Sequence, residues 1–413
     1  MKTRHHTRGA LCVFGLMTAA CGGDATTQDV MSSTDLAAVV DTMSGHDVAS
    51  EPADVEPQEV TATPVDAVAP QDVVAPLDTE PPTDVVVGED VAAVHVPKEV
   101  RFAVLGDGGT GSDTQRKVAV ALRDTCARKG CDFTVLLGDN IYDAGVESVI
   151  DAQWDSKFEV PYADVEMPFY AVLGNHDNGG FLTQWIGDIF GGAGAEFERG
   201  DFQVAYTQVS DKWRMPARHY DFRVGPAHFF ALDSNDMVWS RGNDHAAGRA
   251  QFQMDTIPSK MDASDAIWKI TLAHHPWTSN GKHGDAGAYE GLEEGITDLV
   301  TNIPGLGDLS DVVTGDGVLE AYDTIVCGRA DLHFGGHEHN LQWFLPTNEC
   351  PGTHFVVSGA AAKTTKLKRD DRTVFQHDAT AGFFWVYLKD NAIEVEAISE
   401  DGTTLWSWQG FKD

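Results

Sequence analysis

The sequence predicts an α/β fold in which two packed β-sheets are flanked by helices, and three observations lead to this prediction. From Glu99 onward, short apolar runs alternate with polar helical segments, the pattern of chains that lay helices over sheets. After Phe355 the apolar runs follow one another closely, which indicates strands that pair antiparallel. Several apolar runs are also followed at once by Gly and a polar side chain, as expected where a strand ends in a tight turn.

The individual elements can be assigned in chain order from this alternation. We expect a strand over Val100–Leu105, a helix over Asp113–Lys129 and a second strand over Phe133–Leu137. The amphipathic stretch Ala246–Met261 predicts a helix that is interrupted at Pro258. The remaining strands are expected at Phe169–Leu173, Ala227–Leu232, Trp268–Ala273, Phe355–Val357, Phe383–Leu388, Ile393–Ile398 and Thr404–Trp408.

Composition divides the chain into three parts. Residues 24–97 carry 16 Asp and Glu, no Lys or Arg, 8 Pro and no aromatic side chain. Such a segment cannot bury enough apolar surface to offset its ordering entropy, so we expect a disordered acidic linker rich in Pro, Val and Asp. Residues 98–413 are left as one large folded domain. The formal net charge of the chain is −35, which argues against nucleic acid as a binding partner.

The first 23 residues have the features of an export signal. Lys2, Arg4 and Arg8 precede the apolar run Ala10–Ala20, and Cys21 follows it. This arrangement resembles a bacterial lipoprotein signal peptide with Cys21 as the lipidated residue; the alternative is an ordinary secretory signal cleaved near the same point. Together with the acidic spacer, it predicts an exported protein of the bacterial envelope, in the periplasm or at the outer membrane, that is anchored to the membrane through lipid on Cys21.

Export also makes the cysteines of the folded domain candidates for disulfide bonds. Cys126, Cys131, Cys327 and Cys350 allow three pairings. Pairing within each local couple, Cys126 with Cys131 and Cys327 with Cys350, is the simplest of the three.

Four of the predicted strands, and the short apolar run that ends at Phe334, are followed by side chains that can bind metal ions. Because ligands collect beyond the carboxyl ends of the strands in open α/β sheets, we expect these side chains to meet. Seven candidates are too many for one tetrahedral ion but suit two ions that share a bridging carboxylate. The candidate metal ligands are Asp107, Asp139, Tyr142, Asn175, His274, His337 and His339.

The ordered motifs around these residues resemble those of the metallophosphoesterase family, and in detail those of its purple acid phosphatase branch. The chain carries Gly-Asp-x-Gly from Gly106, Gly-Asp-x-x-Tyr from Gly138, Gly-Asn-His-Asp from Gly174 and Gly-His-x-His from Gly336. Tyr142 is the marker of the branch, and the surrounding residues resemble the tartrate-resistant acid phosphatase type. The resemblance covers about residues 101–362 and implies a sandwich of two mixed β-sheets flanked by helices, with a di-metal site at the C-terminal ends of the strands.

The resemblance also implies a role for each ligand. The first metal would be held by Asp107, Asp139, Tyr142 and His339, and the second by Asn175, His274 and His337, with Asp139 bridging the two. A phenolate from Tyr142 favours Fe(III) at the first site, whereas the second set of ligands suits a divalent ion, Zn, Fe or Mn.

By the same resemblance, the chain is expected to be an exported acid phosphatase that hydrolyses phosphate monoesters by attack of metal-bound hydroxide on phosphorus. His176 would hydrogen-bond the transferring phosphate and His283 would act as general acid, whereas His275 is expected to pack or bind solvent. One alternative is a phosphodiesterase or nucleotidase whose pocket is shaped by residues 179–218. Another is a surface-binding lipoprotein without catalytic activity.

Overall fold

The computed structural model describes residues 98–179, 196–289 and 314–412, all of which belong to one compact unit. The signal peptide predicted at 1–23 and the linker predicted at 24–97 lie outside the described residues, so both stay predictions. Within the three described ranges, no helix is both long enough and apolar enough to cross a membrane.

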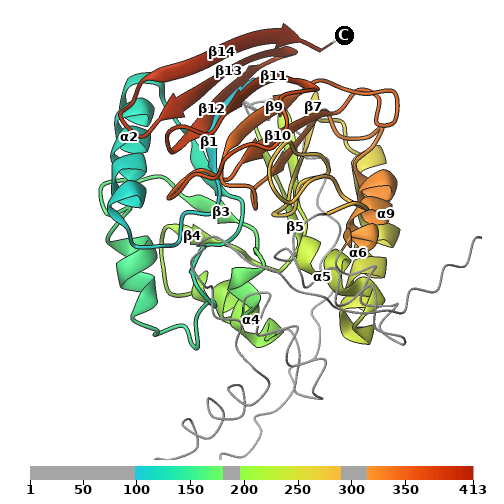
Figure 1. Cartoon of the computed structure of the whole chain (residues 1–413), viewed down its shortest axis with the longest axis horizontal. Coiled ribbons are helices and arrows are strands. Elements are labelled where there is room, and N and C mark those ends of the chain that lie inside the picture. Colours follow the sequence, from blue (N-terminus) through green and yellow to red (C-terminus); the bar gives the residue numbers. More distant parts are fainter. Residues whose placement is uncertain (1–97, 180–195, 290–313, 413) are drawn as a thin grey trace, which may run out of the picture. The chain divides into compact units, whose positions relative to one another are not determined.

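Two seven-stranded sheets form the centre of the domain (Figure 1). The first sheet has the order β14-β13-β12-β1-β2-β3-β4, in which β1 to β4 run parallel and β12 to β14 form an antiparallel meander on β1. Its strands are β1 (Glu99–Leu105), β2 (Phe133–Leu136), β3 (Phe169–Ala171), β4 (Trp213–Arg214), β12 (Gly382–Lys389), β13 (Ala392–Ser399) and β14 (Thr404–Phe411).

The second sheet has the order β11-β9-β10-β8-β7-β6-β5. Strands β6, β7, β8 and β10 run parallel, and β5 and β9 pair antiparallel at either side of them. Its strands are β5 (Tyr220–Val224), β6 (Ala227–Ala231), β7 (Trp268–Leu272), β8 (Leu332–Gly335), β9 (Leu341–Phe344), β10 (His354–Ser358) and β11 (Thr373–His377).

Three apolar clusters hold these layers together. The first lies between the sheets, where Phe102 and Phe133 of the first sheet meet Phe229 and Phe334 of the second. A second cluster packs α2 (Asp113–Lys129) on the outer face of the first sheet, and a third packs helices on the outer face of the second (Figure 1). The further helices are α4 (Phe197–Tyr206), α5 (Ser234–Val238), α6 (Asp244–Asp262) and α9 (Asp316–Ile325). The central parallel strands of both sheets are therefore covered on both faces, as expected for parallel strands.

The predicted fold class, with two mixed sheets flanked by helices, is confirmed. Both local disulfides are present, Cys126 with Cys131 and Cys327 with Cys350. The interruption expected at Pro258 is wrong, because α6 continues through this residue. Ile257 and Met261 on either side of the proline are buried in the third cluster, and burying such side chains contributes enough to offset one lost backbone hydrogen bond.

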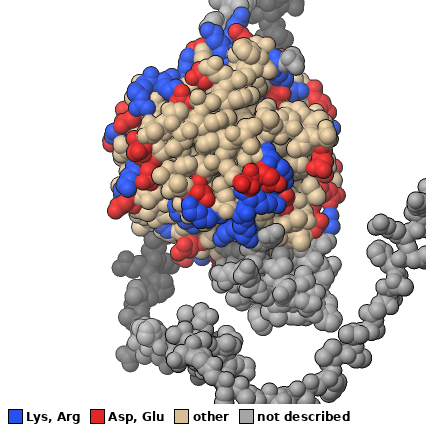
Figure 2. Space-filling view, turned by 45° about the horizontal axis from the view of Figure 1, so that its top comes forward, with Lys and Arg blue, Asp and Glu red and all other residues tan. Residues whose placement is uncertain are grey.

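On the face seen in Figure 2, Lys and Arg side chains are interspersed with Asp and Glu, and much of the surface between them is uncharged.

Candidate metal centre

The seven predicted ligands all lie beyond the carboxyl ends of parallel strands, and both sheets contribute to them. In the first sheet, Asp107 follows β1, Asp139 and Tyr142 follow β2, and Asn175 follows β3. In the second sheet, His274 follows β7, and the pair His337 and His339 follows β8. The structure brings these side chains into two clusters that share one residue, Asp139.

The first cluster gathers around the phenol of Tyr142. Its O–H donates to Asp139 Oδ2 at 2.8 Å and lies 3.1 Å from Asp107 Oδ1. His339 Nε2 lies 3.3 Å from the same hydroxyl and 3.4 Å from Asp107 Oδ1. Two carboxylate oxygens and one imidazole nitrogen therefore lie within 3.3 Å of this hydroxyl.

The second cluster gathers around Asn175. Its side-chain oxygen lies 3.0 Å from His274 Nε2 and 3.1 Å from His337 Nδ1, and these two nitrogens are 3.2 Å apart. The other oxygen of the shared carboxylate, Asp139 Oδ1, lies 3.5 Å from His274 Nε2. Asp139 thus turns one oxygen toward each cluster, the geometry needed for a bridging ligand.

The chemistry of this donor set fits bound cations. His274 Nδ1 donates to the Leu137 carbonyl at 2.8 Å, so its Nε2 carries a lone pair in the neutral ring. That lone pair points at the oxygens of Asn175 and Asp139, which are acceptors too. Acceptors that face one another at such distances repel unless a cation lies between them, and a ligand histidine held by its other ring nitrogen is typical of metal sites. Two triads, Asp107–Asp139–His274 and His274–His275–His337, have ligand atoms close enough to hold a metal.

Burial controls the ionisation of the oxygen ligands. It raises the pKa of Asp107 to about 7, with the neighbouring Asp139 adding to the effect. Burial also opposes the ionisation of Asp139, but His274 and His176 outweigh it and lower the pKa of that carboxyl below its usual value. Burial and the two carboxylates raise the pKa of the Tyr142 phenol well above its usual value, so a phenolate here needs a cation beside it.

The backbone at the site is unusual for the residues that occupy it. Asp107, Asp139 and His337 have φ angles of 60°, 52° and 67°, in the left-handed region that side chains other than Gly rarely adopt. Gly174 allows the close approach of two ligand loops, because a Cβ there would lie 2.2 Å from the backbone nitrogen and one carboxylate oxygen of Asp139. This strain is concentrated at predicted ligands, as is common at functional sites.

Three further histidines border the clusters. The ring of His176 lies 4.5 Å from that of Tyr142, and its backbone N–H donates to Asp139 Oδ1 at 2.9 Å. The ring of His283 lies 4.3 Å from that of His337. His275 is buried and its Nδ1 hydrogen-bonds Ser234 at 2.8 Å, which agrees with the packing role expected for it.

Glu338 is a residue of the site that sequence reasoning missed. Its buried carboxylate accepts hydrogen bonds from the backbone N–H groups of Lys282 at 3.1 Å and His283 at 2.6 Å. Gly281 completes this contact, because any Cβ there would clash with the carboxylate. Glu338 thus ties the loop that carries His283 to the turn between His337 and His339. A charged residue at the variable position of Gly-His-x-His is the signal that could have indicated it.

Asp177, the last residue of Gly-Asn-His-Asp, has a similar role on the other side of the site. Its buried carboxylate accepts from the backbone N–H groups of Asn140 at 2.9 Å, Ile141 at 3.1 Å and Gly174 at 2.8 Å, and from Gln203 Nε2 at 2.7 Å. It therefore joins the loop after β2 to the loop after β3, the two loops that carry Asp139 and Asn175.

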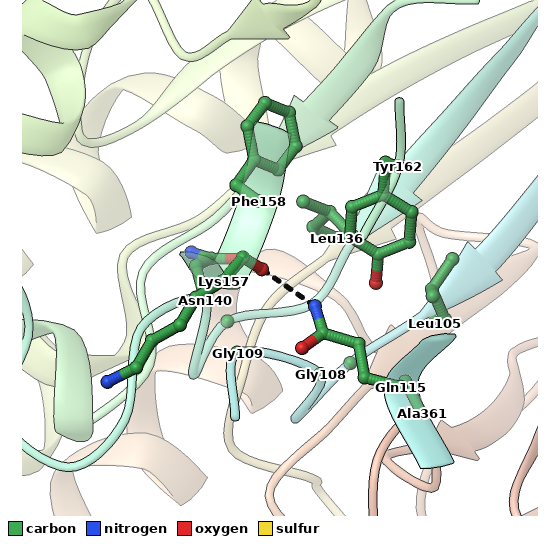
Figure 3. A pocket seen from close by; sticks show the side chains of 12 residues that line it. Leu105, Gly108, Gly109, Gln115, Leu136, Asn140, Lys157, Phe158, Tyr162 and Ala361 are labelled. Carbon is green, nitrogen blue, oxygen red and sulfur yellow. Dashed lines mark hydrogen bonds between the residues drawn. The ribbon is translucent and has the colours of Figure 1, made fainter. Parts of the chain in front are cut away.

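A small cavity lies behind the first ligand loop, between Gly108 and Gly109 and the side chains of Gln115 and Tyr162 (Figure 3). Gln115 crosses it to donate to the Lys157 carbonyl at 2.7 Å (Figure 3). With a volume of about 10 Å³ it has room for about one water molecule and none for a substrate. The residues around this cavity therefore support the ligand loop and do not form a substrate pocket.

The fold and the paired clusters define a metallophosphoesterase. The family profile described as calcineurin-like phosphoesterase matches residues 100–341, and the chain belongs to this family. Among curated proteins it is similar to the tartrate-resistant acid phosphatase type 5 of Rattus norvegicus, with 24% identity over 340 residues that cover 74% of this chain and 89% of the relative. It is also similar to purple acid phosphatase 4 of Arabidopsis thaliana, with 24% identity over 328 residues that cover 77% and 86%. The predicted likeness to purple acid phosphatases, and with it the class of phosphoric ester hydrolases, is confirmed.

Two solved structures share the fold. Purple acid phosphatase from yellow lupin, Lupinus luteus, superposes with a TM-score of 0.52 at 16% identity, covering 76% of this chain and 54% of the lupin chain. GAP50, described as the anchor in the inner membrane complex of Plasmodium, superposes with a TM-score of 0.55 at 19% identity, covering 76% and 90%. At these identities the superpositions speak for the fold alone.

Proposed function

We propose that this chain is an exported acid phosphatase that hydrolyses phosphate monoesters at a site for two metal ions. The observation that carries the proposal is the division of the seven side chains into two clusters that share Asp139, with one carboxylate oxygen turned to each. A pair of ions held this way can bind two oxygens of one phosphate group and neutralise the charge that develops during phosphoryl transfer.

The residues present fit two different ions. Asp107, Asp139, Tyr142 and His339 would hold the first, and the phenol among them favours Fe(III). Asn175, His274 and His337, with Asp139, would hold the second, a divalent ion such as Zn, Fe or Mn. When bound, such ions supply an activated water nucleophile and positive charge for the phosphate.

His176 and His283 are the two protein groups that we assign to the transferred phosphate and the leaving group. His176 is part-exposed beside the first cluster, where its ring can donate a hydrogen bond to a phosphate oxygen. Burial, and after it the positive charge of Lys282, lower the pKa of His283 to about 3 in the free protein. A phosphate dianion beside this ring would raise its pKa again, so the acid role is coupled to substrate binding.

Two other functions use the same fold. A phosphodiesterase or nucleotidase would differ in the pocket that surrounds the site. We expect residues 179–218 to shape this pocket. Residues 180–195 of this segment lie outside the described residues, and residues 196–218 include α4 and β4. A purely structural role is the other candidate, since GAP50 is described as an anchor and a shared fold does not by itself establish catalysis. The complete set of candidate ligands in this chain favours an enzyme.

Export and anchoring belong to the proposal and rest on residues 1–97. The basic residues, apolar run and Cys21 support a lipoprotein signal, and the acidic segment behind it supports a spacer. Cell fractionation of wild type and Cys21→Ser tests this directly. Wild type should sediment with membranes and the variant should not. If both proteins distribute equally, Cys21 is not lipidated and the signal is an ordinary secretory one.

The catalytic part of the proposal is tested with the purified folded domain, metal analysis and a panel of mono- and diesters. We expect two equivalents of metal and faster hydrolysis of monoesters than of diesters at mildly acidic pH. Faster diester hydrolysis would select the phosphodiesterase. Metal binding without hydrolysis of any ester on the panel would select the structural role.

A further inference from the structure

A second cavity lies on the outer face of the second sheet, apart from the metal centre. Its volume is about 390 Å³, within the range of sites that bind small organic molecules. None of the seven candidate metal ligands lines it, and neither does His176 or His283. The cavity is therefore a separate place where a ligand can bind, and its walls indicate which kind.

The inner wall of this cavity is apolar and aromatic. Phe344, the last residue of β9, and Phe355 of β10 line it and are both buried. Trp277, from the loop after β7, stacks on Phe355 with the ring centroids 4.5 Å apart, and Leu319 of α9 completes the wall. These four side chains belong to, or pack against, the apolar cluster that holds the helices on the second sheet. The wall is therefore kept in place by the core.

Negative charge lies at the edge of the cavity. Asp323 of α9 and Glu349, in the loop between β9 and β10, both line it and are exposed to solvent. In the three described ranges, neither carboxylate forms an ion pair. Asp285, the third acid of the lining, is paired at 3.1 Å with Arg372, the only Lys or Arg that the structure describes in the lining. Two carboxylates beside the aromatic wall are therefore left without a cation from the protein.

A disulfide restrains the two segments that carry these acids. Cys327 and Cys350 are bonded, which joins the chain just after α9 to the loop before β10. Asp323 lies four residues before Cys327, and Glu349 directly precedes Cys350. Because the two segments are linked covalently, little ordering is needed when a ligand binds beside them.

We propose that this cavity binds an organic cation in which an ammonium group is joined to an apolar ring. The ring would lie against Trp277, Phe344 and Phe355, and the ammonium group would lie toward Asp323 and Glu349. Cations are attracted both to the faces of aromatic rings and to carboxylates, whereas an anion of the same size would be repelled. The site is separate from the metal centre and does not depend on the phosphatase activity proposed above.

The test uses three compounds that share a benzene ring and a two-carbon chain but differ in charge. These are 2-phenylethylammonium, 2-phenylethanol and phenylacetate. Each is titrated into the purified full chain by isothermal calorimetry at neutral pH, with inorganic phosphate present to occupy the metal centre. We expect the ammonium compound to bind with a Kd of about 1 mM, the alcohol to bind at least about tenfold more weakly, and phenylacetate not to bind at about 10 mM.

Two variants remove the charges and keep the size of the side chains, Asp323→Asn and Glu349→Gln. One ion pair at about 4 Å in water corresponds to about a fivefold change in binding, so each variant should raise Kd for the ammonium by about that factor and leave Kd for the alcohol unchanged. Glu320→Gln is the matched control. Glu320 is also an exposed acid of α9, but it is paired with Arg241 at 3.0 Å and does not line the cavity, so this variant should bind the ammonium as wild type does.

The double variant should bind the ammonium no more tightly than the alcohol. Equal binding of the ammonium and the alcohol by wild type would overturn the proposal, because the carboxylates would then select nothing. Binding that the double variant retains at wild-type strength would overturn it too, since the cation would be held elsewhere. So would the absence of binding at about 10 mM ammonium. These measurements use no phosphatase assay, so their outcome is independent of the proposed function.

Discussion

The two sheets contribute different chemistry to the same site. The strand ends of the first sheet supply only oxygen, from Asp107, Asp139, Tyr142 and Asn175. Those of the second sheet supply only imidazole nitrogen, from His274, His337 and His339. Each cluster nevertheless contains both kinds of atom, so each draws on both sheets.

This difference shows why the site depends on the packing between the sheets. Neither sheet alone could form either cluster, and the apolar cluster around Phe102 and Phe229 sets the distance between them. Oxygen ligands suit harder ions, and imidazoles suit borderline ones. The first cluster offers three oxygens and one nitrogen, whereas the second offers two of each, so the two clusters would prefer different metal ions.

The largest effect is expected where both clusters meet. Asp139→Asn removes the negative charge of the shared carboxylate, and should lower metal content at both sites and turnover by more than about 10²-fold. Asn175→Ala touches only the second cluster and should lower metal content at one site. Metal analysis and a phosphatase assay measure both variants. If Asp139→Asn keeps two equivalents of metal and near-normal turnover, Asp139 is not shared.

His283→Ala should slow hydrolysis of esters with poor leaving groups by roughly 10²-fold, because a general acid protonates the departing alkoxide. Esters of acidic phenols need less protonation and should be affected less. A series of aryl and alkyl phosphates measures this dependence. Equal losses along the series would remove His283 from the acid role.

Glu338→Ala releases the loop that carries His283, and we expect kcat to fall about tenfold through loss of orientation. Glu338→Gln keeps one acceptor oxygen and should retain more activity. Metal content should be unchanged in both variants, since the Glu338 carboxylate bonds the backbone of Lys282 and His283 rather than a ligand atom. The two variants should also show a stronger dependence on the leaving group, as His283→Ala does; an unchanged dependence together with lost metal would indicate a role in metal binding.

Tyr142→Phe keeps the ring and removes only one oxygen ligand of the first cluster. Iron-loaded wild type should be violet, because a phenolate transfers charge to Fe(III) in the visible range. The variant should lose that band and hold the first metal more weakly, while the second cluster stays intact. An absorption spectrum and metal titration measure this. A wild type without a visible band, or a variant that keeps it, would contradict iron ligation by Tyr142.

The smallest effect is expected outside the folded domain. Deleting residues 24–97 should leave kcat and KM of the soluble domain within about twofold of wild type, because all predicted ligands, and all strands in the part of the chain that the structure describes, lie beyond residue 97. Steady-state kinetics of the shortened protein measures this. A large loss in turnover would mean that the acidic segment takes part in the fold or the site.

The sequence by itself was sufficient to predict the fold class, most of the strands, the local disulfides and which side chains would gather, but not the strands β4, β5, β8, β9 and β11. The reason is that each candidate ligand lies in the loop that follows a parallel strand, and the carboxyl ends of parallel strands share one edge of a sheet. Local alternation of apolar and polar residues carries that information, and so does the short separation of Cys126 from Cys131 and of Cys327 from Cys350. The predicted identities of the bound metals stay predictions.

Only the tertiary structure decided how those side chains face one another. The turn of Asp139 toward both clusters depends on left-handed backbone angles that its sequence does not favour. The contacts of Glu338 with Lys282 and His283 join residues more than fifty positions apart. Lys363 likewise reaches Tyr142 across more than two hundred positions. Such contacts depend on how two sheets and their loops pack in space, and no local pattern encodes that packing.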